Sequence, residues 1–174
     1  YNGKQFFQSL VSAGQVAEVA HPRDPFSVNL TARFGTVVGF YDSTVTDVQA
    51  TLKKRNGRLV ELNATGKLNG RSPLAVKLDR TNGARIIRAE SRDAGAAFRL
   101  IGFYPKVDGG EASLEVNLDA SNAGMKAGTL WARNFAVLGD SVVSDVLADP
   151  QSQAALGGER KKQVRQNRIA FDQL

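Results

Sequence analysis

The chain has 174 residues, of which 42% are hydrophobic and 23% are charged, with a net charge of +6 and no cysteine. These values are ordinary for one folded domain with its own core, so we expect a single domain. The absence of cysteine excludes disulfides and thiolate metal sites. No apolar run approaches the length of a membrane-spanning helix or of a signal-peptide core.

The positive charge is partly concentrated in residues 151–168, which are polar, contain glycine and carry few apolar groups. Such a segment buries too little apolar surface to offset the entropy of ordering it, so we expect a flexible basic loop there. The remaining lysines and arginines are scattered over predicted strands and turns, without the interleaved aromatic residues that base stacking requires. We therefore expect no nucleic-acid partner.

The first predicted elements are a short amphipathic helix at Gln5–Val19 and two strands at Phe26–Phe34 and Thr36–Tyr41, separated by Gly35. The helix has apolar residues at helical spacing, and the first strand alternates apolar and polar residues. The two strands are candidates for antiparallel pairing.

Three Asn-Gly dipeptides, at 56–57, 69–70 and 82–83, predict two-residue hairpin turns. They connect segments that alternate with period two. The predicted strands are Thr44–Arg55, Arg58–Leu68, Leu74–Leu78 and Ala84–Ser91.

An almost wholly apolar helix is predicted from Asp93 to Tyr104, with Asp93 as its N-cap and Pro105 as its stop. Arg99 is its one charged residue after the cap, so the helix must be covered on most sides. It is either a core helix packed on a sheet, or a helix that plugs the end of an apolar groove or touches a membrane interface. Gly109-Gly110 predicts a turn, followed by an alternating strand at Ala112–Leu118.

The last predicted elements are a strand at Lys126–Phe135, a helix at Ser141–Ala148 and the start of a further strand at Ile169–Leu174. Asp140 is a suitable N-cap for the helix, and Pro150 ends it. Because the chain stops at the start of a strand, we expect residues 1–174 to be a single β-groove segment of a longer protein.

The predicted fold is mainly β: an antiparallel meander that forms a curved, groove-like (taco-type) sheet with two or three short helices. Successive hairpins place one apolar face of every strand on the same side of the sheet. That face either becomes the core of a closed sandwich or lines an open groove for long hydrocarbon chains. The predicted lining residues are Phe26, Val28, Leu30, Val48, Ala50, Leu52, Val60, Leu62, Leu74, Val76, Leu78, Leu114, Val116 and Leu118.

No residue pattern predicts catalysis. His21 is the only histidine, and no cysteine accompanies it, so neither a metal site nor a histidine-based triad can be assembled at a recognisable spacing. The acidic residues are spread over turns and polar faces, and no glycine-rich phosphate loop occurs. We therefore expect no catalytic residue, no metal and no cofactor, and a protein that is not an enzyme.

Four segments of the chain resemble parts of a known family. The residues 91–99 and 107–114 resemble the "D-G-A … G-G-x-L-x-L" block of the AsmA-like C-terminal region family. The residues 128–137, followed by the helix at Val142–Leu147, resemble its "G-x-L-x-x-x-x-F-x-V" strand and short helix. Ile169–Leu174 is similar to the next strand of that family. The resemblance covers roughly residues 26–174 in order. The chain departs from the family in its basic insert after Pro150 and in lacking the anchor and the following strands.

The resemblance implies a bacterial cell-envelope protein of the YhdP and TamB type, anchored in the inner membrane by a segment outside this chain. Its β-groove would extend into the periplasm and bind or conduct phospholipid, or another long-chain lipid, between the inner and outer membranes. The alternative is a closed β-sandwich with a structural, adhesion or carbohydrate-binding role and no lipid. Carbohydrate binding would need exposed aromatic platforms, for which Trp131, Tyr41 and Tyr104 are available.

Overall fold

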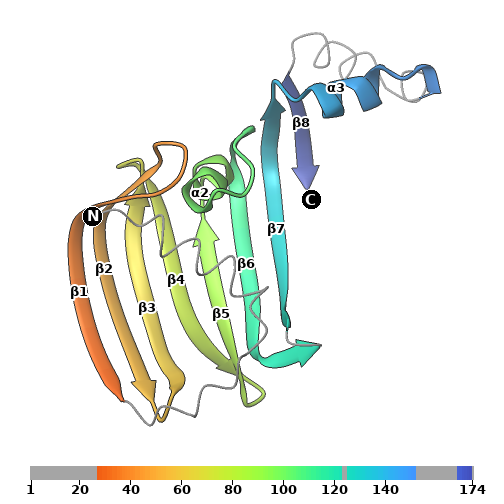
Figure 1. Ribbon diagram of the computed structural model, residues 1–174. Coiled ribbons are helices and arrows are strands. Elements are labelled where there is room, and N and C mark those ends of the chain that lie inside the picture. The colour runs from red at the N-terminus through yellow and green to blue at the C-terminus, as the bar shows by residue number, and fades with distance from the viewer. Residues whose placement is uncertain (1–26, 123–124, 152–167, 174) are drawn as a thin grey trace.

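The described part of the chain is one antiparallel β-sheet with two short helices (Figure 1). The computed structural model describes residues 27–122, 125–151 and 168–173. The eight strands lie in the sheet in chain order, so the two edge strands are the first and the last and the sheet is open. The strands are β1 (Val28–Val38), β2 (Thr44–Arg55), β3 (Arg58–Leu68), β4 (Ser72–Thr81), β5 (Ala84–Ser91), β6 (Val107–Asn122), β7 (Met125–Leu138) and β8 (Arg168–Gln173).

The three predicted Asn-Gly hairpins are all confirmed. They join β2 to β3, β3 to β4 and β4 to β5, and every such pair of strands is antiparallel. The asparagines have φ from 47° to 50° and the glycines from 72° to 79°. Positive φ at both central residues is the type I′ geometry that matches the twist of the flanking strands. Local turn chemistry therefore fixes the meander.

The sheet is curved, and α2 (Ala94–Ile101) lies inside one end of the curve (Figure 1). The registers of β2–β3 and β6–β7 are interrupted by irregularities at Thr46/Gln49, Lys53/Lys54 and Asn117/Ser121. An extra residue on one strand bends that strand and increases its local twist. These interruptions account for part of the curvature.

The first strand is a correction to the sequence reading. Phe26–Phe34 and Thr36–Tyr41 were expected to be two strands, whereas β1 runs without a break from Val28 to Val38. Gly35 does not interrupt it, because its φ is not positive and the strand continues to pair with β2 on both sides of it. A glycine ends a strand only where the chain takes a conformation that other residues avoid.

The start of β6 is a second correction. Gly109-Gly110 was expected to be a turn before a strand at Ala112, whereas β6 begins at Val107 and passes through both glycines. Both have positive φ, and Asn134 opposite them on β7 has φ 55°. Val107 pairs with Val137 beyond this point, so the two strands kink together and remain hydrogen-bonded.

The helix α2 begins as predicted but ends earlier. Asp93 Oδ1 accepts a hydrogen bond from Ala96 N at 2.8 Å, which confirms the N-cap. Gly102, with φ 74°, forms a left-handed C-cap after Ile101, so the helix ends four residues before Pro105. The proline is not the stop signal.

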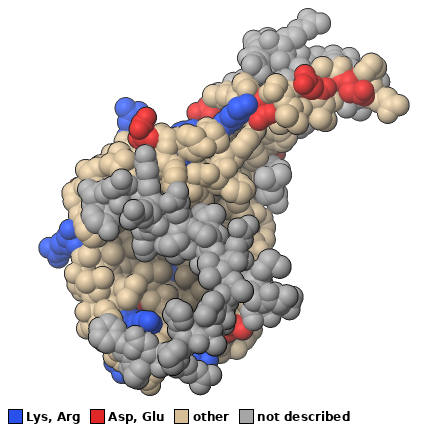
Figure 2. Space-filling view, viewed as in Figure 1, with Lys and Arg blue, Asp and Glu red and all other residues tan. Residues whose placement is uncertain are grey.

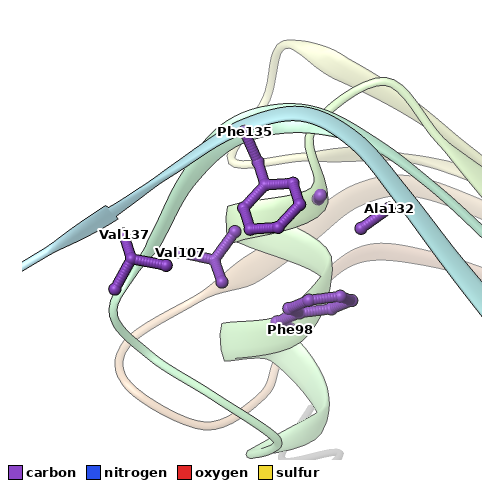
Figure 3. Packing of buried hydrophobic residues seen from close by; sticks show 6 residues of the cluster. Phe98, Val107, Ala132, Phe135 and Val137 are labelled. Carbon is purple, nitrogen blue, oxygen red and sulfur yellow. The ribbon is translucent and has the colours of Figure 1, made fainter. Parts of the chain in front are cut away.

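The hydrophobic core surrounds α2. One cluster joins Phe98 of this helix to Val107 on β6 and Phe135 on β7 (Figure 3), and a second joins Leu100 to Val45 and Leu68. Arg99 does not oppose this packing, because its guanidinium donates a hydrogen bond of 2.8 Å to the carbonyl oxygen of Val107. The helix is thus a core helix packed on the sheet.

The helix α3 (Ser141–Ala148) has the predicted bounds, and its N-cap Asp140 accepts a hydrogen bond from Val143 N at 3.1 Å. The predicted helix at 5–19 and the predicted loop, apart from its two end residues, lie outside the described residues. Arg168, which was assigned to that loop, is the first residue of β8.

Tyr104 links the loop after α2 to α3 by donating a short hydrogen bond to Asp140. Burial and this hydrogen bond raise the pKa of Tyr104 to about 12. We expect absorbance at alkaline pH to show a tyrosine that ionises near that value and is missing from Tyr104→Phe. Because the folded pKa lies above the usual pKa of about 10, the stabilisation is complete below pH 10 and is lost between about pH 10 and 12. Identical titration of both proteins would contradict the hydrogen bond.

Candidate functional site

The strand registers place the predicted lining residues on one face of the sheet, which we call the apolar face. A single row crosses seven strands and contains only apolar residues: Ala32, Ala50, Ala64, Val76, Ala89, Leu114 and Leu130. Parallel to it, Leu30 pairs with Leu52, which pairs with Leu62. Phe26 lies outside the described residues. The alternation of the sequence therefore becomes one continuous apolar surface.

Several residues of this surface were missed by the sequence reading. They are Ala32, Ala64, Ile87, Ala89 and Leu130. Ala32 and Ala64 have the same alternating phase as the predicted residues of β1 and β3, so the signal was present in those two strands. Four of the seven positions in the central row are alanine. Because alanine side chains are short, they leave space above this row inside the curve of the sheet.

The apolar face is not a closed core. Every buried hydrophobic side chain of the described residues lies elsewhere, in or near the clusters that surround α2 or on β7 and β8, and none is a predicted lining residue. The described lining residues are half-buried or exposed: Leu30 is 51% exposed, and Val76 and Val116 are half-buried. A sandwich core would bury them. Figure 2 shows a hollow on this side of the sheet, in which mostly uncharged atoms are visible.

One end of the apolar face is covered by α2. Ala96 and Leu100 of the helix form one buried cluster with Val45 and Leu68, and the partly buried Val48 and Leu74 pack against this cluster. These strand residues lie at the end where β3 turns into β4. On the other side it packs against Ala132 and Phe135 of β7. The helix therefore lies across this end, and the apolar face continues beneath it toward the opposite hairpins.

The opposite end is basic. A hollow of about 410 Å³ there is lined by four arginines and one carboxylate, and we call this group the basic end. The group consists of Arg55, Arg58, Arg80, Arg85 and Asp119. Its arginines flank the Asn56-Gly57 and Asn82-Gly83 hairpins, which lie side by side because β3 and β4 are neighbours.

Arg85 is fixed within the basic end. Its Nη2 atom lies 2.5 Å from Asp119 Oδ1, and its Nη1 atom donates a hydrogen bond of 3.1 Å to the carbonyl oxygen of Leu59. The hydrogen bonds from Arg85 hold the pKa of the Asp119 carboxyl well below its ordinary value. The pair keeps both charges at every physiological pH.

The other face of the sheet is polar, and several of its charged side chains form ion pairs across the strands. Arg88 lies 3.0 Å from Asp79 and 2.6 Å from Glu115, and Lys53 lies 2.6 Å from Glu61. These cross-strand pairs alternate along the strands with the apolar positions. The two faces therefore differ in chemistry, as the period-two pattern predicts.

The three aromatic residues considered for carbohydrate binding lie on different elements. Trp131 is 40% exposed on β7 and lines a separate hollow of about 710 Å³ with polar-face residues such as Glu90 and Arg133. Tyr41 is in the β1–β2 loop, and Tyr104 is hydrogen-bonded to Asp140. The structure does not assemble them into one platform.

Within residues 27–122, 125–151 and 168–173, no group of three or more histidine, cysteine or acidic side chains could hold a metal ion. The only histidine of the chain, His21, lies outside these ranges. Neither helix in the same ranges has the length and hydrophobicity to cross a membrane.

Fold and site together define an open antiparallel β-trough with an apolar face, a helix across one end and a basic opposite end. No family model, curated protein or solved structure matches this chain.

Proposed function

We propose that the trough binds the acyl chains of a phospholipid along its apolar face, and that the protein is a lipid-binding rather than a catalytic one. The observation that carries this proposal is the half-exposed state of a continuous apolar face in a sheet whose buried core lies elsewhere. A contiguous apolar surface of this kind is costly in water unless a ligand or partner covers it.

The dimensions of the apolar face suit an acyl chain. From Leu74, which contacts the cluster at α2, to Arg80 at the basic end is six residues along β4. At about 3.3 Å per residue this is about 20 Å. One leaflet of a bilayer has a hydrocarbon layer of about 15 Å, which is half of the full core. A chain of membrane-lipid length therefore fits between α2 and the arginines.

The resemblance to the AsmA-like C-terminal region family adds a cellular location to this proposal. The protein would be the periplasmic part of an inner-membrane-anchored bacterial protein that moves phospholipid between membranes. In such a protein this segment would bind lipid at one position along a longer groove, since α2 lies across one end of the trough.

The proposal is tested by placing a charge on the apolar face. We expect Val76→Asp or Val116→Asp to abolish lipid binding, because a carboxylate in the trough would have to lose its water to contact an acyl chain. Both positions are half-buried, so the fold should survive, with a loss of about 1 kcal/mol for aspartate in a strand. Native mass spectrometry with palmitoyl-oleoyl phosphatidylglycerol measures binding, and thermal unfolding measures stability.

The matched control is Thr65→Asp, an exposed position on the polar face of β3 that pairs with Gln49 and Ala75. It adds the same charge to the same sheet and should leave lipid binding unchanged. A wild-type chain that binds no lipid would reject the proposal. Outright unfolding of Val76→Asp would reject the open trough, since a buried unpaired carboxylate costs several kcal/mol.

A further inference from the structure

The basic end projects from the same face as the apolar residues. Arg80 is two residues from Leu78, and Arg85, which pairs with Arg80, is two residues from Ile87. Side chains two residues apart on a strand point to the same side of the sheet. Arg80 and Arg85 therefore continue the apolar rows of β4 and β5 at the end away from α2. Arg58 follows the register shift of β2–β3 and lines the same hollow together with Val60. Figure 2 shows Lys and Arg side chains at the lower end of the hollow.

The charge of this group is not balanced by its neighbours. Four arginines and one aspartate give the basic end a net charge of 4 − 1 = +3. Asp119 is engaged by Arg85 through hydrogen bonds from three of its nitrogen atoms, the backbone N, Nε and Nη2. Among the described residues, Arg58 and Arg80 have no carboxylate within ion-pair distance. On the polar face, in contrast, Arg88 and Lys53 are paired.

The arrangement suits a phosphate group. Guanidinium groups bind phosphate oxygens by paired, charge-assisted hydrogen bonds, which are roughly twice as strong as neutral ones. Arg85 is half-buried and held by Asp119 and the Leu59 carbonyl, so it is already ordered. The exposed Arg58 and Arg80 on either side are free to turn toward a ligand.

We propose that the basic end binds the phosphate headgroup of an anionic phospholipid, whose acyl chains run along the apolar face toward α2. This inference rests on the proposed lipid-binding function and specifies its ligand class and orientation. A zwitterionic lipid such as phosphatidylcholine brings a trimethylammonium group to the same arginines, and like charges are unfavourable there. An anionic lipid such as phosphatidylglycerol brings none. The trough therefore selects for net negative charge.

The test compares phosphatidylglycerol with phosphatidylcholine carrying the same acyl chains, by native mass spectrometry at fixed ionic strength. The wild-type chain should prefer phosphatidylglycerol by about tenfold, because both lipids carry the phosphate but only phosphatidylcholine brings a cation close to the arginines. Arg58→Gln/Arg80→Gln should bind phosphatidylglycerol more weakly than the wild type does and should lose the preference between the two lipids. Arg33→Gln/Arg71→Gln removes the same charge from exposed positions outside the basic end and should keep the preference.

Each outcome separates the two proposals. If the wild type binds neither lipid, the lipid-binding function and this inference both fail. If it binds both lipids equally, or if the control loses the preference as completely as Arg58→Gln/Arg80→Gln, the headgroup site is rejected while the acyl-chain trough stands. Loss of all lipid binding in Val76→Asp together with a retained wild-type preference supports both.

Discussion

Replacing Phe98 by alanine is expected to lower the free energy of unfolding by about 3–5 kcal/mol, the usual cost for a buried phenylalanine. Phe98 is 4% exposed and packs with Val107, Ala132 and Phe135. Its contribution is large because the apolar face is half open and most of the buried core lies around α2. For a domain of this size we expect the melting temperature to fall by about 10 °C, measured by thermal or urea unfolding.

The matched control is Phe103→Ala. Phe103 is 62% exposed and touches Phe98 edge-on, with ring centroids 5.4 Å apart. It should cost only about 1 kcal/mol, the value of an aromatic pair beyond its burial. If both substitutions destabilise the protein equally, α2 is not the centre of the core.

The meander was predictable because its determinants are local. Each Asn-Gly pair sets its own turn, and Asp93 and Asp140 cap their helices through residues no more than three positions away. The alternation of apolar and polar residues then assigns a face to each strand without knowledge of its partner. These features were read correctly because no tertiary contact is needed to produce them.

The errors occurred where a partner strand decides the structure. Gly35 and Gly109-Gly110 were read as interruptions, yet β1 and β6 continue through them because β2 and β7 supply hydrogen bonds on both sides. The positive φ of Asn134 opposite Gly109-Gly110 shows that the kink belongs to two strands together. A single strand read alone contains no sign of this compensation.

The candidate site also has one part that the sequence predicts and one part that depends on strand pairing. The apolar face was predictable from alternation, whereas the basic end was not, because its arginines lie in four strands on either side of two hairpin turns. They meet only because β2, β3, β4 and β5 are neighbours in the sheet. One signal was nevertheless available: Arg58, Arg80 and Arg85 share the phase of the apolar positions in their strands.

Replacing Gly95 by alanine sets two opposing effects against each other. Alanine is favoured over glycine in a helix by up to about 1 kcal/mol. A Cβ atom at Gly95, however, would lie 2.4 Å from the carbonyl oxygen of Val107 and 3.1 Å from Asp108 Cα, both in the backbone of β6. Overpacking of this kind costs about 1–3 kcal/mol, and a paired strand cannot easily move aside. We expect the clash to outweigh the helix propensity, with a net loss of about 1 kcal/mol in the free energy of urea unfolding.

The same substitution at Gly35 isolates the clash from the change of residue type. An added Cβ there meets no atom within 4 Å, and the residue is exposed on β1 with φ outside the positive region. Since alanine is favoured over glycine inside a strand by about 0.5–1 kcal/mol, Gly35→Ala should be neutral or slightly stabilising. The opposite signs at the two glycines follow from the close packing of α2 on β6. A stabilising Gly95→Ala would show that the helix has room to move away from the sheet. In that case α2 would not hold its end of the trough closed.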